Sequence, residues 1–293
     1  MEPHRITTIA SRAALASLGL ALFLPVPPRP AEGAPTSKLA APCELVLSPY
    51  AGVLRTVVVR SGSYEAPFLL DTGGGGTVLS LAAAQELGLS PFGRLTGFRH
   101  DGARVDGPRA GPVELALGTF SRRGEVGVFD VDALLAGLPA VGGIVSLETF
   151  AGQALTFDLA HERLFLESPE TLAARRKGAS ELAVRAAHQA SGAALDLFVA
   201  VEGEHGWLWF ELDSGNVAPV LLAPHAFVEL GLEPLPLGQV GKVELPIVGL
   251  GLVPCEVQCK ELIYDGLLNA AFFARFTVSL DLAAGRGWAR ANT

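Results

Sequence analysis

Two aspartates stand in matching sequence contexts, and they are the residues of this chain best suited to acid–base chemistry. Each follows a largely apolar stretch and precedes a hydroxyl residue and a glycine, in Phe68-Leu69-Leu70-Asp71-Thr72-Gly73 and in Phe210-Glu211-Leu212-Asp213-Ser214-Gly215. A carboxylate at the end of an apolar strand is costly to bury alone, whereas two carboxylates that meet can share one proton. Such a pair suits hydrolysis, because the charged partner draws a proton from water while the protonated partner polarises a carbonyl.

The segments around the two aspartates repeat along the chain, which indicates an internal duplication. Val59 and Val201 each lie 12 residues before their aspartate, and a Leu-Gly-Leu follows at 87–89 and at 230–232. Further matches recur at an offset of 123 residues: 143–146 with 266–269, Asp158 with Asp281, and Arg163 with Arg286. The two aspartates are 142 residues apart, so the first half carries an extra excursion of about 19 residues. Equivalent residues of a duplicated fold can meet at its pseudo-twofold axis, which predicts that Asp71 and Asp213 come together.

Short apolar stretches separated by glycine-rich turns predict a mostly β chain with few short helices. Strands are expected before each aspartate, at 53–60 and 67–71 in the first half and at 195–201 and 207–213 in the second. Ser80 is placed to cap a short helix that runs through Glu86, and Gly88 to end it. The polar, alanine-rich segment 168–192 predicts a connector between an N-terminal lobe at 49–167 and a C-terminal lobe at 193–293.

At the two tripeptides the chain resembles the pepsin-like and retropepsin-like aspartic proteases, over about residues 50–290. The resemblance implies a bilobal acid-protease fold, with two similar β-barrel-like lobes and a cleft between them. It implies Asp71 and Asp213 as the catalytic dyad, and the loop residues Thr72, Gly73, Ser214 and Gly215 as its support. It also implies a flap within 92–140. The chain departs from the family pattern at Gly74 and Asn216 after the tripeptides, at Ser146 and Asn269, and in having no tyrosine in the expected flap.

The predicted function is therefore an exported aspartic peptidase that hydrolyses a peptide or protein substrate in the cleft, as a monomer and without a metal or organic cofactor. The alternative is a non-catalytic peptide-binding or interaction protein on the same fold. A net charge of −8 argues against a nucleic-acid surface. Hydrophobic residues make up 49% of the chain, enough for a substantial core.

The N-terminus predicts an export signal over residues 1–33. Arg5 and Arg12 supply positive charge, the apolar run 13–26 is short for a membrane span, and a proline cluster follows it. The mature protein would be periplasmic or secreted, with 34–48 as a linker. Anchoring in a membrane through 13–26 is the weaker alternative.

Other chemistries have less support in the sequence. The glycine run 73–76 lacks the Gly-Lys-Ser/Thr ending of a phosphate loop, and neither HExxH nor G-x-S-x-G occurs. Asp158 and Asp281 are expected at structural hairpins, and Asp265 has no acidic counterpart, so none joins the site. Trp207 and Trp209 are expected in the core or the cleft wall. Three cysteines, Cys43, Cys255 and Cys259, allow one intrachain disulfide whose pairing stays open.

Overall fold

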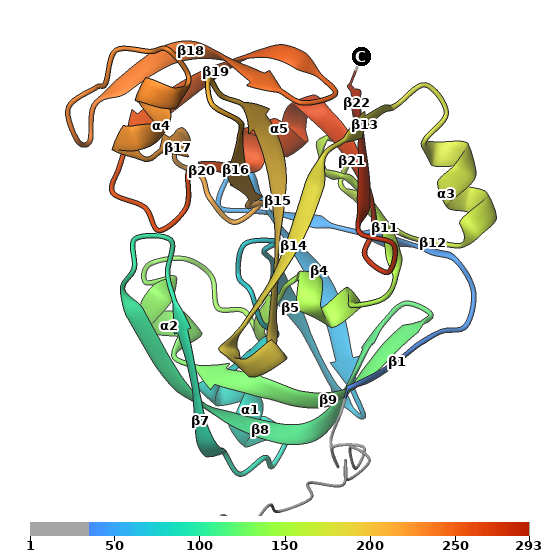
Figure 1. Cartoon of the computed structure of the whole chain (residues 1–293). Helices are drawn as coiled ribbons and strands as arrows, with labels where there is room; N and C mark the ends of the chain where they lie inside the picture. Colours follow the sequence, from blue (N-terminus) through green and yellow to red (C-terminus); the bar gives the residue numbers. More distant parts are fainter. Residues whose placement is uncertain (1–34, 293) are drawn as a thin grey trace, which may run out of the picture. The chain divides into compact units, whose positions relative to one another are not determined.

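The computed structural model describes residues 35–292, and β-strands predominate in this part of the chain (Figure 1). The strands form three sheets, two of which build separate lobes while the third joins the two halves of the chain. The described residues belong to one compact unit. The predicted mostly β, two-lobed architecture is confirmed.

The N-terminal lobe is built on a nine-stranded sheet in the order β1-β9-β6-β10-β5-β4-β8-β7, with β3 paired to β4. Its strands are β1 (Thr36–Leu39), β3 (Ser48–Tyr50), β4 (Leu54–Ser61), β5 (Tyr64–Leu70), β6 (Val78–Ser80), β7 (Phe92–Phe98), β8 (Arg104–Leu117), β9 (Phe120–Phe129) and β10 (Gly143–Val145). Helix α2 (Val131–Leu134) follows β9, and α1 (Leu81–Glu86) follows β6. The side chain of Ser80 accepts a hydrogen bond from the Ala83 amide, and Gly88 takes a left-handed φ of 64°, which are the predicted start and end of this helix.

The C-terminal lobe repeats this plan in a seven-stranded sheet in the order β14-β15-β16-β20-β17-β19-β18. Its strands are β14 (Val184–Gln189), β15 (Ala194–Glu202), β16 (Trp207–Leu212), β17 (Val220–Leu222), β18 (Val240–Ile247), β19 (Gly251–Cys259) and β20 (Gly266–Leu268). Its helices are α4 (Pro224–Glu229) and α5 (Ala270–Arg275), with a 3-10 turn η3 (Ala190–Gly192) between β14 and β15. Large fully buried side chains such as Phe210, Phe227 and Phe273 fill the interior.

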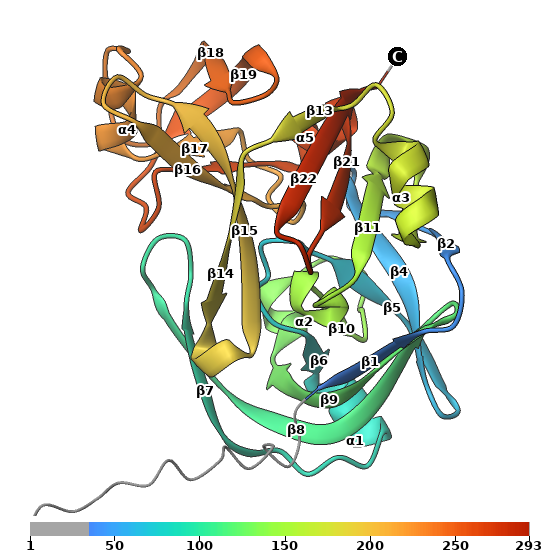
Figure 2. The same ribbon diagram turned by 45° about the vertical axis from the view of Figure 1, so that its right-hand side comes forward.

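A six-stranded sheet takes strands from both halves, in the order β13-β22-β21-β11-β12-β2 (Figure 2). Its members are β2 (Cys43–Val46), β11 (Ala154–Asp158), β12 (Arg163–Glu167), β13 (Ser180–Leu182), β21 (Phe276–Asp281) and β22 (Arg286–Ala291); the 3-10 turns η1 (Leu147–Phe150) and η2 (Leu159–His161) flank β11, and α3 (Pro169–Arg175) follows β12. At its centre β11 runs antiparallel to β21, and Thr156 lies opposite Ser279 with their hydroxyls 2.9 Å apart. Because these two residues are counterparts at the 123-residue offset, the local twofold axis of the duplication passes between them.

The segments predicted to be linkers contain regular structure. Within 34–48, β1 pairs with β9 and β2 pairs with β12. Within 168–192, α3 is followed by β13 and β14, which pair with β22 and β15. The three cysteines are free, Cys43 on β2 and Cys255 and Cys259 on β19.

The predicted export signal 1–33 and its apolar run 13–26 lie outside the described residues, so export stays a prediction. Among the helices of residues 35–292, none has the length and apolar character needed to cross a membrane.

Candidate active site

Asp71 and Asp213 occupy equivalent positions in the two halves. Strand β5 runs parallel to β10, and the Asp71 amide just beyond β5 donates to the Val145 carbonyl at 3.0 Å. Strand β16 runs parallel to β20 in the same way, and the Asp213 amide donates to the Leu268 carbonyl at 3.0 Å. Each aspartate is therefore fixed at the point where one strand leaves the sheet beside a parallel neighbour.

Thr72 and Ser214 link the two aspartate loops through four buried hydrogen bonds. The Thr72 amide donates to Ser214 Oγ at 3.1 Å, and the Ser214 amide donates to Thr72 Oγ1 at 2.9 Å. Each hydroxyl then donates to the carbonyl that ends the opposite strand, Thr72 to Leu212 at 2.6 Å and Ser214 to Leu70 at 3.2 Å. Both side chains are almost inaccessible to water, so this network holds the loops of the two halves together in a low-dielectric environment.

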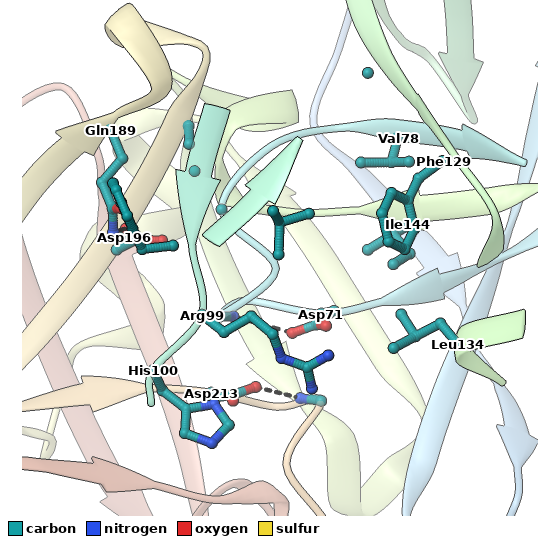
Figure 3. Close-up of a pocket in the computed structure, with 18 of the residues that line it drawn as sticks. Asp71, Val78, Arg99, His100, Phe129, Leu134, Ile144, Gln189, Asp196 and Asp213 are labelled. Carbon is teal, nitrogen blue, oxygen red and sulfur yellow. Dashed lines mark hydrogen bonds between the residues drawn. The ribbon is translucent and has the colours of Figure 1, made fainter. Parts of the chain in front are cut away.

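The carboxyl groups of Asp71 and Asp213 lie next to each other and both line the cavity between the lobes (Figure 3). Backbone amides support both: Gly73 donates to Asp71 Oδ1 at 3.1 Å, and Gly215 and Asn216 donate to Asp213 Oδ1 at 2.8 and 3.1 Å. Burial raises the pKa of Asp71, and burial together with the charge of Asp71 raises the pKa of Asp213 well above its ordinary range. The pair therefore retains a proton at pH values where isolated aspartates are fully ionised.

Gly73 and Gly215 leave room for this close approach. A Cβ on Gly73 would lie 2.5 Å from Asp213 Cγ, and a Cβ on Gly215 would collide with the carboxyl of Asp71 in the same way. The glycine of each tripeptide is thus required by the carboxyl of the other half.

We expect Gly73→Ala to push the two carboxyl groups apart and so to lower the higher apparent pKa of the pair, because separated carboxylates ionise more independently. The measurement is a carbon-13 NMR titration of the aspartate carboxyl groups. Gly97→Ala is the control, because a Cβ at Gly97 meets no atom within 4 Å. An unchanged titration in Gly73→Ala would contradict the steric argument.

The glycines that follow Asp71 accommodate a hairpin from the other half of the chain. The turn between β14 and β15 lies against them: Leu195 donates its amide to the Gly75 carbonyl at 3.1 Å, and a Cβ on Gly76 would lie 2.8 Å from the Ala193 carbonyl oxygen. Ser146 donates its hydroxyl to the same Gly75 carbonyl at 2.8 Å. These contacts give the glycine run a packing role.

A cavity of about 530 Å³ lies above the two carboxyl groups. The hairpin of β7 and β8 contributes Phe98, Arg99 and His100 to its lining, within the segment 92–140 where a flap is expected. The tip of this hairpin is bound to the C-terminal lobe, because Ile263 donates its amide to the His100 carbonyl and Lys260 Nζ lies 2.9 Å from His100 Nε2. The hairpin therefore spans the cavity from one lobe to the other.

Two further carboxyl groups, which the sequence analysis did not single out, also line the cavity. Asp196 on β15 and Glu211 on β16 are 2% and 3% exposed. Asp196 Oδ2 accepts a hydrogen bond of 2.5 Å from Gln189 Nε2, which also lies 3.0 Å from the Tyr264 hydroxyl. The signal that could have revealed them is the duplication itself: at the 142-residue offset, Asp196 and Glu211 replace Leu54 and Leu69.

Burial raises the pKa of Asp196 to about 6, with a further contribution from the charge of Asp71, while the Gln189 hydrogen bond opposes the shift. The folded state therefore binds more protons than the unfolded state between about pH 4 and 6, and Asp196 destabilises the fold progressively as the pH rises through that range. We expect Asp196→Asn to increase the free energy of unfolding at pH 7.5, relative to its effect at pH 4, by up to about 3 kcal/mol.

Urea unfolding of wild type and variant at the two pH values measures this difference. Glu202→Gln, an exposed carboxyl at the end of the same strand, is the matched control and should show no comparable change. An effect of Asp196→Asn that is equal at both pH values would contradict the assignment.

The other repeated or neighbouring aspartates have structural partners. Asp265 accepts from the Trp209 amide at 2.7 Å and bonds His225 at 2.9 Å. Asp158 bonds His161, and Asp281 accepts from the Ala284 amide, so both stabilise hairpin turns as expected. Within residues 35–292, no group of three or more His, Cys, Asp or Glu side chains is arranged to hold a metal ion.

Comparison with known proteins supports the fold alone. Solved structures with a similar fold include basic 7S globulin from soybean (8% identity, TM-score 0.53) and conglutin gamma, a basic 7S globulin from lupine seeds (11% identity, TM-score 0.54). Each match covers 86% of this chain and 95% of the globulin chain. These globulins share the bilobal pepsin-like fold, so the predicted fold class is confirmed.

The predicted membership of the pepsin-like and retropepsin-like aspartic protease family is wrong. Neither a protein-family model nor a curated protein matches the sequence. The solved structures named above are seed globulins. A duplicated Asp-Thr/Ser-Gly motif is required by the way the two loops bind each other, so it accompanies the fold and does not by itself identify a protease family.

Proposed function

We propose that the cavity binds an extended peptide and that Asp71 and Asp213 hydrolyse a peptide bond of it. The observation that carries the proposal is the pair of adjacent, buried carboxyl groups that line a cavity between two lobes. Because the charge of Asp71 raises the pKa of Asp213, the two groups ionise in separate steps, and between these steps the pair holds one proton and one negative charge.

The chemistry follows from that charge state. The ionised carboxylate accepts a proton from a water molecule, whose oxygen attacks the carbonyl carbon of the peptide. The protonated carboxyl donates its proton toward the carbonyl oxygen, so a tetrahedral diol forms without a separated charge. Transfer of a proton to the nitrogen then allows the C–N bond to break. The two aspartates supply every proton transfer, and the amides of Gly73 and Gly215 keep the carboxyl groups oriented.

A second candidate is peptide binding without turnover. The observation that favours it is the comparison with known structures, since both named neighbours are described as basic 7S globulins and neither as a peptidase. This candidate uses the same cavity and predicts that a peptide binds and is released intact.

One experiment separates the two candidates. The mature protein is incubated with an unfolded protein substrate from pH 3 to pH 7, the products are identified by mass spectrometry, and peptide binding to Asp71→Asn is measured in parallel. Cleavage that is lost in Asp71→Asn and in Asp213→Asn supports hydrolysis. Binding to wild type with no cleavage at any pH supports the second candidate, and cleavage that survives both substitutions contradicts the role of the pair.

A further inference from the structure

The two walls of the cavity are related by the duplication but differ in chemistry. Thr56 lies opposite Leu69 in the β4–β5 pair, and Phe198 lies opposite Glu211 in the β15–β16 pair. Both members of the second pair lie 142 residues after those of the first, so the two hairpins have the same register. The register therefore makes position 54 the structural counterpart of position 196, and position 69 the counterpart of position 211. The members of each pair lie on opposite sides of the carboxyl pair.

On the side of the N-terminal half, the wall is apolar. Leu54, Leu69 and Ile144 line the cavity and belong to one buried cluster, against which Val78 and Phe129 pack. Figure 3 shows Val78, Phe129 and Ile144 gathered on one side of the site, and Gln189 and Asp196 on the other. A peptide that crosses the cavity therefore meets an apolar surface on one side of the reacting bond.

On the side of the C-terminal half, the counterparts of Leu54 and Leu69 are Asp196 and Glu211. Glu211 is 97% buried and lines the cavity, and its carboxyl group makes no hydrogen bond within the part of the chain that the structure describes. The oxygens of Glu211 are not fully enclosed by protein and are accessible from the cavity. A largely buried carboxyl group without a protein partner is destabilising by comparison with the leucine that the other half has at this position. A ligand that supplies a hydrogen-bond or charge partner to Glu211 would explain a carboxyl group in this wall of the cavity.

Among residues 35–292, His188 lies close enough to Asp196 for its charge to lower the pKa of that carboxyl group, but it forms no ion pair with it. No Lys, Arg or His of residues 35–292 forms an ion pair with Asp196 or Glu211. Arg99 and His100 line the cavity from the β7–β8 hairpin, but His100 is bound to Lys260 and Arg99 makes no ion pair in the described part of the chain. The same part of the chain has no metal-binding arrangement of carboxyl groups.

We propose that Asp196 and Glu211 form a subsite for a cationic side chain, arginine or lysine, of a peptide whose neighbouring residue across the reacting bond is apolar. The proposal rests on the proposed peptide binding in the cavity and specifies its substrate class. A guanidinium or ammonium group in this subsite would form charge-assisted hydrogen bonds in an enclosed, water-poor environment, where such bonds are strongest.

The ionisation of the wall is consistent with this assignment. Burial raises the pKa of Glu211 well above its ordinary range, and the charges of Asp213, Asp196 and Asp71 raise it further. A bound cation opposes all of these effects, so it allows Glu211 and Asp196 to ionise and to pair with it. An uncharged isostere of arginine does not provide this compensation.

The test compares peptides that differ in one side chain. Each peptide has eight residues, with leucine and a variable residue as its two central residues. The variable residue is arginine, citrulline, norleucine or glutamate. Each pair is made in both orders, with leucine before or after the variable residue. Citrulline has the shape of arginine without its charge. Turnover is followed by mass spectrometry, and binding of the same peptides to wild type and to Asp71→Asn is followed by calorimetry. The variants are Glu211→Leu, Glu211→Gln and Asp196→Asn, with Glu202→Gln as the matched control.

We expect wild type to prefer arginine over citrulline by about tenfold or more in kcat/KM, in one of the two peptide orders. The preference should fall below about threefold in Glu211→Leu and in Glu211→Gln, and should persist in Glu202→Gln. Glu211→Leu restores the residue that the other half has at this position, and Glu211→Gln keeps the size of the side chain, so a failure of one variant to fold leaves the other as a test.

The outcomes for the subsite and for hydrolysis are distinguishable. The subsite is contradicted if the peptides are cleaved without a preference for arginine, or if both Glu211 variants keep that preference. Either result still supports hydrolysis. Tighter binding of the arginine peptide without turnover, lost in the Glu211 variants, supports the subsite and overturns hydrolysis. Peptides that are neither bound nor cleaved overturn both.

Discussion

Asp71→Asn and Asp213→Asn should each reduce peptide turnover by about 10²- to 10⁴-fold, the range that general acid–base catalysis contributes. Each substitution removes one of the two proton positions that the reaction alternates between, while the amide keeps the size and most of the hydrogen bonds of the carboxyl group. The measurement is kcat/KM for one cleaved peptide across pH 3 to 7. Asp281→Asn, which changes a repeated aspartate outside the cavity, is the control.

The free energy of unfolding distinguishes loss of chemistry from loss of structure. Because both carboxyl groups have raised pKa values, placing a second negative charge in the site is unfavourable at neutral pH. Replacing either group by an uncharged amide should therefore leave the folded state at least as stable as wild type at pH 7. Inactive variants that are also less stable would indicate that the aspartates act chiefly as structural residues.

Thr72→Val should lower the free energy of unfolding by about 2 to 4 kcal/mol. Valine has the shape of threonine without its hydroxyl, so the Leu212 carbonyl loses its donor and the Ser214 amide loses its acceptor. Both groups are buried between the two halves, where an unsatisfied polar group costs about 1 to 3 kcal/mol. Urea unfolding at pH 5 measures the change, and Thr72→Ser, which keeps the hydroxyl, should lose less than half as much.

The same substitution should also loosen the carboxyl pair. The hydroxyls of Thr72 and Ser214 connect each aspartate loop to the strand of the opposite half, so the distance between the carboxyl groups depends on them. The higher apparent pKa of the pair is therefore expected to fall in Thr72→Val. A destabilised variant with an unchanged titration would show that the network supports the fold without positioning the aspartates.

The local elements around each aspartate could be predicted from the sequence because their signals are short-range or repeated. Ser80 and Gly88 mark the ends of α1, and the two Asp-Thr/Ser-Gly motifs predict that equivalent loops meet, which the structure shows through Thr72 and Ser214. The pairing of distant strands could not be predicted in this way. Nothing in the composition of 36–39 or 43–46 specifies β9 or β12 as partners, because an edge strand is defined by the surface that it joins.

The second pair of carboxyl groups was missed for a physical reason. Charged residues are almost always exposed unless they are paired, so an Asp within Ala194–Val201 or a Glu between Phe210 and Leu212 is ordinarily assigned to the solvent face of a strand. Here both faces of β15 are buried, and the alternation that would reveal a polar face is absent. Comparing the halves position by position, at the same offset that relates Asp71 to Asp213, exposes the exception.

The hydroxyl pair of Thr156 and Ser279 marks a twofold axis that relates two halves of one chain rather than two identical chains. A cleft on the axis of two identical chains has the same wall on both sides, so a peptide can bind in two equivalent orientations with opposite chain directions. With the halves joined in one chain, Leu69 and Glu211 can differ without any loss of the contacts on the axis. The covalent duplication thus makes the two sides of the cleft different, so the cleft can distinguish the two chain directions of a bound peptide.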